Sequence, residues 1–441
     1  MAITDGQYMS AFDEILKLYY LGPVREQLNN KRVLLKRMRR DNKSISGKYA
    51  EIPIHIKRNA TVGARADAKA LPAASKQTYD NARVKMKYQY GRIQVTGPTI
   101  AASRNDRGAF LKAVDSELSG VTKDLQQDIN RQLFGDGTGR LCKISNTITS
   151  CNTALTVTTM GASGPNWKHP ENIIWDNMPI NVLDTSGYTT YHAATGATAC
   201  MLANNPTSST SLKWDQDTAI TSTGSGDYVT KNLCGFDGGT TGSCVEIMGL
   251  RAHVDDGNLF AATGTGSTGL FVQNIDAGST KAVSAWRAKV IENPSSAGTA
   301  RSLNLDIMQE AFDNVEIKNG GDVTLILTTA GIRRKYLDLL RADRRFVKEM
   351  TLDGGFKAVD YNGSPLVVDI HATNYDMYFL DESTFAIYNM SDIDWMDKDG
   401  AVLCRVSGYD AYEATLFWYL ELGCSARNKN CRLTDINETA L

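Results

Sequence analysis

The sequence predicts an α+β fold, and three stretches carry that prediction. Residues 106–134 have the apolar spacing of one long helix. Residues 48–97 alternate apolar and polar side chains as a long β-hairpin does. Residues 303–441 mix helical segments with short apolar strands. The order of these stretches predicts a long helix, a projecting ribbon and a mixed C-terminal part in one chain.

The long helix is predicted from apolar residues that recur in steps of three and four. Ser103 or Asp106 can cap its start, and Gly135 follows its end. At 1.5 Å per residue the helix would be roughly 40 Å long. A single stripe without sustained heptads favours a strut laid across a sheet over half of a coiled coil. The stripe consists of Phe110, Val114, Leu118, Val121, Leu125, Ile129 and Leu133.

The hairpin pattern places Ile52, Ile54 and Ile56 on one face of the first strand and Val84 and Met86 on the second. Its tip, between residues 58 and 82, is rich in small and charged residues. A two-stranded ribbon is marginal in water and cannot bury both of its own faces. It therefore needs another surface, either the body of the same chain or a neighbouring subunit.

Composition excludes several classes of protein. The 441 residues carry 48 basic and 49 acidic side chains, so bulk charge indicates neither a nucleic-acid nor a membrane partner. No run of eighteen apolar residues occurs, and the first twenty residues lack the pattern of a secretory signal. The eight cysteines show no CxxC spacing, which argues against zinc and for free thiols in a reducing cytosol. Cys142 with Cys151, and Cys424 with Cys431, are near enough in sequence to pair on oxidation.

The N-terminal 40 residues combine an amphipathic turn with a basic segment, and they carry eight Lys or Arg against four Asp or Glu. Two interpretations stay open. The segment is either the solvated face of a helix or an arm that lies on neighbouring subunits or packaged nucleic acid. Its basic residues are Lys31, Arg32, Lys36, Arg37, Arg39 and Arg40.

Residues 141–245 are rich in Thr, Ser and Gly, with short apolar patches between turn residues. This pattern predicts a small all-β module inserted after the long helix. Trp167, Trp175 and Trp214 favour a packed core over disorder. The tract from 257 to 300 is Gly-rich, with strands expected at 270–272 and 286–291.

The C-terminal part predicts a helix over 303–315, a buried strand at 323–327 and a helix over 331–346 capped by Thr328 or Thr329. Tyr336 and Leu339 are expected to face inward on the second helix. Residues 414–422 are apolar on nearly both faces, as a central strand would be. Shorter strands are expected at 366–370, 377–380, 385–388 and 402–406.

No motif predicts an enzyme, a cofactor site or a metal site. Gly135–Gly139 lacks the Gly-Lys-Ser/Thr of a phosphate-binding loop, so it is interpreted as a turn. The five histidines are far apart, and we interpret them as structural or surface residues. The acidic run 392–399 fails the register of a calcium loop. Arg333 and Arg334 begin a basic helix that is either solvated or in contact with another subunit.

The chain resembles the major capsid proteins of tailed bacteriophages, which have the Hong Kong 97-type fold. The resemblance covers most of the length in the order of its parts. Familiar stretches are Val62-Gly63-Ala64-Arg65 with Leu71-Pro72, Phe134–Gly139, Gly249-Leu250, LDIMQEAFDNVEI, TLILTTAGIRRKYLDLL and Tyr361–Val367. The inserted β module is extra relative to the minimal fold. The lysine–asparagine crosslink of some relatives cannot be aligned here and is not predicted.

The resemblance implies an arrangement of six parts. These are an N-terminal arm at 1–47, an extended loop at 48–100, the spine helix of a peripheral domain at 101–140, the inserted module at 141–245, a mainly axial domain at 246–380, and C-terminal strands at 381–441 that return to both domains.

The resemblance also implies a function, namely pentamers and hexamers that tile an icosahedral shell around double-stranded DNA. The subunit would be located in the virion after assembly in the host cytoplasm. Expected partners are other copies of the chain, DNA bound without sequence specificity, a portal, a separate scaffolding protein and a decoration protein, but no membrane. Contacts between subunits are expected at Arg65, Asp67, Lys69, Arg104, Arg107, Arg333 and Arg334.

Three alternatives stay open at this point. An encapsulin shell that encloses cargo enzymes has the same fold, but its subunits are usually compact. A tail or decoration protein fits the long helix and hairpin poorly. A cytosolic enzyme lacks any constellation of site residues.

Overall fold

The computed structural model describes residues 32–59, 61–67, 69–71, 73–102, 107–145, 155–158, 173–175, 178–183, 201–208, 211–215, 227–231, 245–256, 273, 275, 286–295, 298–342, 349–351, 357–397 and 401–438. The predicted amphipathic turn near the N-terminus, the strand at 270–272 and the cap residues Ser103 and Asp106 lie outside this part of the chain.

The first sheet is centred on β20, Ala411–Cys424. β20 pairs antiparallel with β18, Phe385–Trp395, and with β5, Lys87–Thr96. The short strands β19, Cys404–Arg405, and β1, Arg40–Asp41, complete the sheet. Burial alternates along the first part of β20 and is continuous over its last residues. The predicted central strand at 414–422 is therefore confirmed, with one face partly open over its first part.

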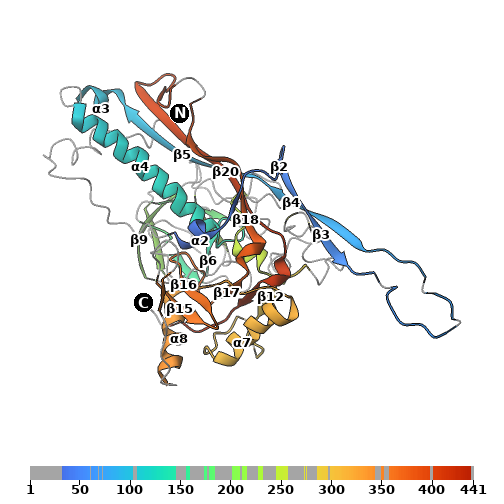
Figure 1. Ribbon diagram of the computed structural model, residues 1–441. Helices are drawn as coiled ribbons and strands as arrows, with labels where there is room; N and C mark the ends of the chain where they lie inside the picture. Colours follow the sequence, from blue (N-terminus) through green and yellow to red (C-terminus); the bar gives the residue numbers. More distant parts are fainter. Residues whose placement is uncertain are drawn as a thin grey trace.

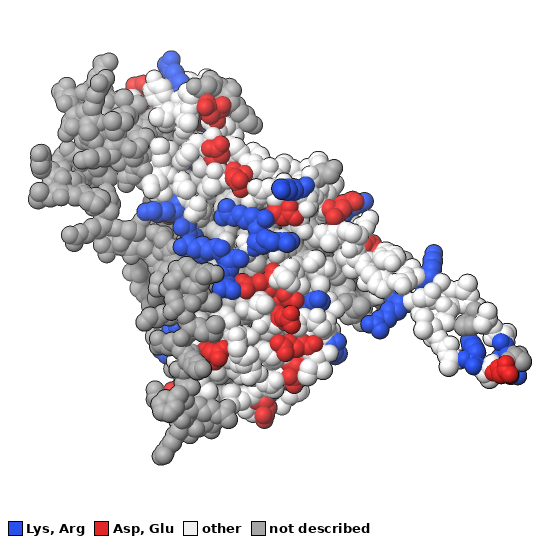
Figure 2. Space-filling view, viewed as in Figure 1, with Lys and Arg blue, Asp and Glu red and all other residues white. Residues whose placement is uncertain are grey.

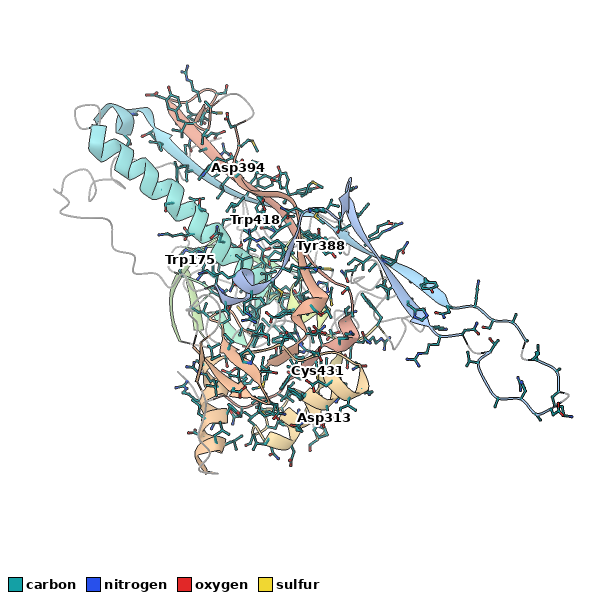
Figure 3. All side chains as sticks on the ribbon, in the orientation of Figure 1. Trp175, Asp313, Tyr388, Asp394, Trp418 and Cys431 are labelled. Atoms are coloured by element: carbon teal, nitrogen blue, oxygen red, sulfur yellow. The ribbon has the colours of Figure 1, made fainter. Side chains whose placement is uncertain are left out.

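The predicted long helix is α4, Arg107–Gln132. Its apolar stripe is buried at Leu125, Ile129 and Leu133, in one core with Trp418 of β20. Figures 1 and 3 show α4 lying along β5 and β20, with Trp418 close to where the helix crosses the sheet. The prediction of a strut across a sheet is confirmed.

The predicted hairpin is formed by β3, Tyr49–Lys57, and β4, Thr78–Lys85. The short strand β2, Ile45–Ser46, extends this sheet at its base. The prediction of one hairpin up to residue 97 is wrong, because β5 leaves β3 and pairs with β20 instead. Alternating apolar and polar side chains indicate that a segment is extended, but they do not show which strand it pairs with. The predicted pairing of residues 87–97 within the hairpin was therefore wrong.

The second sheet has seven strands, in the order β12-β21-β17-β13-β16-β15-β14. Alternate residues of its central strands point to opposite faces of the sheet, and each face belongs to a separate hydrophobic core. Leu325 and Leu327 lie in the core that contains the buried residues of α4, and Ile326 lies in the second core. The strands are β12 Lys289–Ile291, β13 Leu325–Thr328, β14 Glu349–Thr351, β15 Lys357–Tyr361, β16 Ser364–Val368, β17 Met377–Leu380 and β21 Cys431–Leu433.

Two helices pack on the face of the seven-stranded sheet that points away from α4. The first, α7, spans Leu305–Asp313, is capped by Asn304 and continues as a π-helical turn over Asn314–Lys318. The second, α8, spans Ala330–Ala342. The side-chain oxygen of Thr329 accepts the Ile332 N–H at 3.4 Å, which confirms that predicted cap.

Both helices were anticipated, with differences at their ends and faces. The turn beyond α7 carries the helix past the predicted end at 315. On α8, Tyr336 is buried as expected, but Leu340 is more deeply buried than Leu339. Residues 343–348 of the predicted helix lie outside the described part.

The predicted β module is a closed barrel with the strand order β10-β7-β6-β11-β8-β9. Ile144, Ile180, Val182 and Val229 are buried in it. Its strands are β6 Arg140–Ile144, β7 Leu155–Thr158, β8 Pro179–Leu183, β9 Met201–Ser208, β10 Ser211–Asp215 and β11 Tyr228–Lys231. β6 begins eight residues after α4 ends, so the barrel grows from the end of the long helix.

Candidate assembly and polyanion-binding surfaces

The hairpin projects from the body (Figures 1 and 2), and its tip carries exposed apolar side chains. Val62 is 89% exposed and Leu71 is 85% exposed. The predicted contact residues Arg65, Asp67 and Lys69 are exposed at the same tip. The described part of this chain leaves both apolar side chains almost fully uncovered.

Among the described residues, the contacts that anchor the hairpin to the body lie toward its base. Ala50, Val84 and Met86 form a small core with Ala386 and Tyr388 of β18. Farther along, Ala82 packs with Ile275 and Trp286. The exposed ion pair between Arg83 and Glu51 adds little, because exposed pairs contribute at most about 1 kcal/mol. The outer part of the ribbon and its tip are largely exposed.

The basic arm begins with the short helix α2, Val33–Arg37, which is fixed to the body by buried polar groups. The Asp369 carboxylate accepts the N–H groups of Val33 at 3.1 Å and Leu34 at 3.3 Å. The Asn130 side-chain oxygen accepts the Leu35 N–H at 3.1 Å. These bonds hold the start of α2 against α4 and the seven-stranded sheet.

The predicted basic residues of the arm divide into two groups. Arg32 donates to the side-chain oxygen of Gln126, and Arg37 makes a two-point ion pair with Glu382, with both N–O distances 2.7 Å. Lys36, Arg39 and Arg40 are exposed. The guanidinium of Arg40 also lies 5.3 Å from the ring centre of Trp418. Lys31 lies outside the described residues.

Figure 2 shows Lys and Arg side chains gathered in the middle of one face, where Figure 1 places α2. We call the exposed side chains of Lys36, Arg39 and Arg40 the arm patch. Because α2 is held rigidly, these charges are presented at a fixed place. Such a patch attracts a polyanion without reading its sequence.

The other predicted contact residues do not join the hairpin tip within one chain. Arg333 and Arg334 are half-buried on α8, on the opposite side of the molecule from the hairpin in Figure 1. Arg107 begins α4, but its side chain lies outside the described part, as does all of Arg104.

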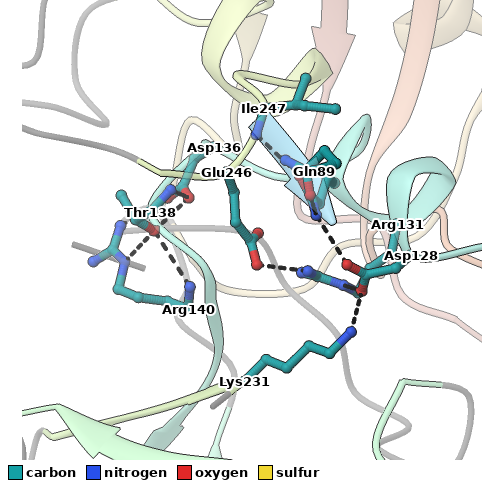
Figure 4. Close-up of polar contacts among 10 residues, drawn as sticks. Gln89, Asp128, Arg131, Asp136, Thr138, Arg140, Lys231, Glu246 and Ile247 are labelled. Carbon is teal, nitrogen blue, oxygen red and sulfur yellow. Dashed lines mark hydrogen bonds and ion pairs between the residues drawn. The ribbon is translucent and has the colours of Figure 1, made fainter. Parts of the chain in front are cut away.

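A buried ionic cluster, absent from the sequence predictions, connects α4 to the barrel (Figure 4). Arg131 pairs with Asp128 at 3.0 Å and with Glu246 at 2.6 Å, and Lys231 of β11 lies 3.2 Å from Asp128. Burial raises the pKa of Glu246. Burial opposes ionisation of Asp128 too, but Arg131 and Lys231 outweigh it and lower its pKa. The i, i+3 spacing of Asp128 and Arg131 was the only sequence signal for this cluster.

Two further buried ionisable groups lie beneath the first sheet. Glu421 accepts the N–H groups of Met248 at 2.9 Å and Leu422 at 3.1 Å, and burial raises its pKa to about 8. His253 bonds the Leu422 carbonyl through its ring at 3.1 Å, and burial lowers its pKa to about 3. His253 is therefore a neutral structural residue, as the sequence predicted for the histidines.

The described residues contain neither a metal site nor a helix that could span a membrane. Within them, no three His, Cys, Asp or Glu side chains are placed to hold a metal ion. No helix of the described part is both long and apolar enough to cross a membrane. Cys424 and Cys431 are both free thiols, whereas Cys151, the suggested partner of Cys142, lies outside the described residues.

Comparison with known proteins gives a fold but no sequence family. No family model and no curated protein sequence matches the chain. A structure described as the cyanophage A-1(L) capsid asymmetric unit is similar at a TM-score of 0.53 and 16% identity, with coverage of 95% of this chain and 97% of that one.

Two other solved structures align over nearly the whole chain at lower scores. The holo-SrpI encapsulin complex from Synechococcus elongatus PCC 7942 has a TM-score of 0.48 and 8% identity, with 100% and 98% coverage. The capsid of an empty GTA particle has a TM-score of 0.47 and 8% identity, with 98% coverage of both chains.

The cyanophage capsid similarity, which spans both chains, agrees with the strut helix, the projecting hairpin and the two sheets. The chain therefore has the α+β fold of the tailed-bacteriophage major capsid proteins, the Hong Kong 97-type fold, with an inserted β-barrel.

Proposed function

We propose that this protein is a major capsid protein whose copies assemble as pentamers and hexamers into an icosahedral shell around double-stranded DNA. The fold supports this function, because a fold similar over 95% of the chain is found in the cyanophage capsid. The work of such a subunit is association rather than catalysis. Contacts that are weak singly suffice when symmetry repeats them around each subunit.

The projecting hairpin is the observation that carries the proposal. Val62 and Leu71 are almost fully exposed at a tip that extends beyond the body of the chain. A neighbouring copy would supply the surface on which this ribbon lies. Burying the two side chains there would contribute about 1.5–3 kcal/mol each.

The arm patch supports the second half of the proposal, which is contact with packaged DNA. Lys36 of α2, Arg40 of β1 and Arg39 between them are exposed, and α2 and β1 are both fixed to the body. Phosphate contacts of this kind need no base recognition and weaken as salt rises. Arg32 and Arg37 are occupied within the chain, so we assign them to fixing the arm rather than to DNA.

The remaining partners follow from the proposed role. A capsid built this way needs a portal for DNA entry and a separate scaffolding protein, and a decoration protein is a further candidate. Assembly in the host cytoplasm and residence in the virion are part of the same proposal.

The proposal is tested on particles purified from cells that make the chain, by treating them with nuclease and identifying what remains inside. Protected double-stranded DNA of uniform length in native particles is the expected result. Particles that contain a defined cargo protein and no DNA would instead identify a nanocompartment shell. A chain that stays monomeric with candidate scaffold present would overturn both.

A further inference from the structure

The two helices on the outer face of the seven-stranded sheet carry opposite charges. Residues 305–318, which form α7 and its π-helical turn, contain four acidic residues and one lysine, a net charge of −3. Residues 330–342, which form α8, contain four basic residues and one aspartate, a net charge of +3. We call these the α7 surface and the α8 surface. The two net charges are equal in size and opposite in sign, in a chain whose own net charge is −1.

The helices share one core, so their charged faces lie on the outside. The ring of Tyr361 stacks edge-on with Phe312 of α7 at 6.0 Å and with Tyr336 of α8 at 5.9 Å. Figure 1 shows α7 and α8 on opposite sides of the lower end of the molecule. Figure 2 shows acidic side chains along the side on which α7 lies. One chain therefore presents the two surfaces in different directions.

The α7 surface also contains an apolar side chain that the fold does not use. Ile317 is 81% exposed in the π-helical turn. Asn319 donates to the Asn314 carbonyl at 2.7 Å, and Gly321 N–H bonds the Val315 carbonyl at 3.0 Å, so this turn is held in place. Single π-helical turns occur frequently at functional sites. This rigid turn therefore presents an exposed isoleucine at a fixed place beside the carboxylates of the α7 surface.

The α8 surface has the complementary composition. Arg333 and Lys335 are half-exposed, and Leu337 and Leu339 are only partly covered by the core. An exposed isoleucine within an acidic surface thus matches partly exposed leucines within a basic one. Complementary potentials of this kind suppress wrong pairings and fix the register of a contact.

We infer that the α7 surface of one copy docks on the α8 surface of the next, so that the copies form a closed ring in head-to-tail order. This inference rests on the proposed function and names the contact that builds its rings. The two surfaces differ, so the contact is heterologous. Repetition of a heterologous contact forms a closed ring where the rotation between copies closes, and an open filament where it does not. A twofold contact of either surface with itself would oppose like charges.

Charge reversal tests this docking directly. Glu310→Lys with Glu316→Lys makes the α7 surface basic, and Arg333→Glu with Lys335→Glu makes the α8 surface acidic. Each pair of substitutions should reduce the fraction of chains in rings and shells at least tenfold, measured by size-exclusion chromatography and negative-stain microscopy. All four substitutions in one chain should restore assembly, because every contact again joins opposite charges.

Two controls separate this docking from folding and from general charge effects. Circular dichroism and the melting temperature of each variant show that it folds. Asp394→Lys with Asp397→Lys changes charge by the same amount on the first sheet, and Figure 3 places Asp394 at the other end of the molecule from Asp313. This control should assemble like the unmodified chain. Assembly of the unmodified chain should also weaken as salt screens the contact.

The outcomes distinguish a failure of the docking between the α7 and α8 surfaces from a failure of the proposed function. Unmodified chains that form shells, together with reversed variants that do so equally well, would overturn the docking and leave the proposed function intact. Failure of the four-substitution chain to recover, although it folds, would also overturn the docking. An unmodified chain that never assembles would overturn the proposed function and the docking with it.

Discussion

The side-chain amide of Asn130 on α4 donates to the carboxylate of Asp369, at 3.0 Å from its nearer oxygen. Both residues are buried, and both also bind backbone N–H groups of α2. One pair of side chains thus fixes the arm to the long helix and to the end of β16. Because a buried carboxylate without partners is costly, the three elements are coupled in stability.

Replacing Asp369 with Ala should release the arm. The change removes the acceptor for Val33 and Leu34 N–H and leaves the Asn130 amide with fewer partners. We expect a loss of about 2–4 kcal/mol in the free energy of unfolding. Hydrogen exchange at the amides of residues 33 and 34 should accelerate more than exchange in the core of α4. The control, Asp41→Ala at the end of β1, removes the acceptor of an exposed bond from the Lys43 N–H and should cost less than about 1 kcal/mol. Unchanged protection of α2 would contradict this role.

Gly249 and Gly120 form a matched pair for a steric test. A Cβ added at Gly249 would lie 2.4 Å from the Gln132 carbonyl oxygen at the end of α4, whereas one at Gly120 would meet nothing within 4 Å. Gly249→Ala should therefore destabilise by more than about 3 kcal/mol or prevent folding. Gly120→Ala should stabilise by up to about 1 kcal/mol, because alanine favours the helix. Equal effects in thermal unfolding would show that the backbone approach at Gly249 is not close.

Glu421 should make stability depend on pH. Burial raises its pKa from 4.5 to about 8 in the folded chain, so the folded state holds this proton more tightly than the unfolded state. Its contribution is fully present below about pH 4.5 and is lost as the pH rises through about 8. The full shift corresponds to on the order of 5 kcal/mol.

The measurement is the difference in unfolding free energy between the unmodified chain and Glu421→Gln across this pH window. Glutamine keeps a carbonyl oxygen for the N–H groups of Met248 and Leu422 but cannot titrate. The difference should shift in favour of the variant as the pH rises. A difference that does not change with pH would show that Glu421 ionises normally.

The hairpin tip should matter for assembly and not for folding. Val62→Ser with Leu71→Ser removes two exposed apolar side chains, so the melting temperature should stay within about 2 °C of the unmodified chain. The concentration needed for assembly should rise at least tenfold, because the neighbour loses about 1.5–3 kcal/mol for each side chain. Ala70→Ser in the same tip is the control. Assembly of the double variant at the original concentration would rule out a contact through these residues.

Local periodicity accounts for the parts of the fold that the sequence predicts well. The apolar stripe of α4, the alternation in β3 and the continuous apolar run of β20 each reflect burial along one element. The strand β5 pairs with β20, which lies more than 300 residues later in the chain. The alternation of side chains in β5 gives no information about which strand is its partner.

The buried polar contacts were missed for the same reason. Asn130 and Asp369 are separated by 239 residues, and Arg131 and Glu246 by 115. Net charge marked the arm as basic, but it could not show that Arg37 is bound to Glu382 while Lys36 faces solvent. The exposed tip and the opposed charges of α7 and α8 become visible only once burial is known.

Cryo-electron microscopy of the chain expressed alone, and again with a candidate scaffolding protein, tests whether copies of the chain assemble into a shell through the hairpin tip. We expect closed shells or capsomer rings in which the tip around Val62 and Leu71 lies on a neighbouring copy. Monomers under every condition, or assemblies in which this tip stays in solvent, would contradict it.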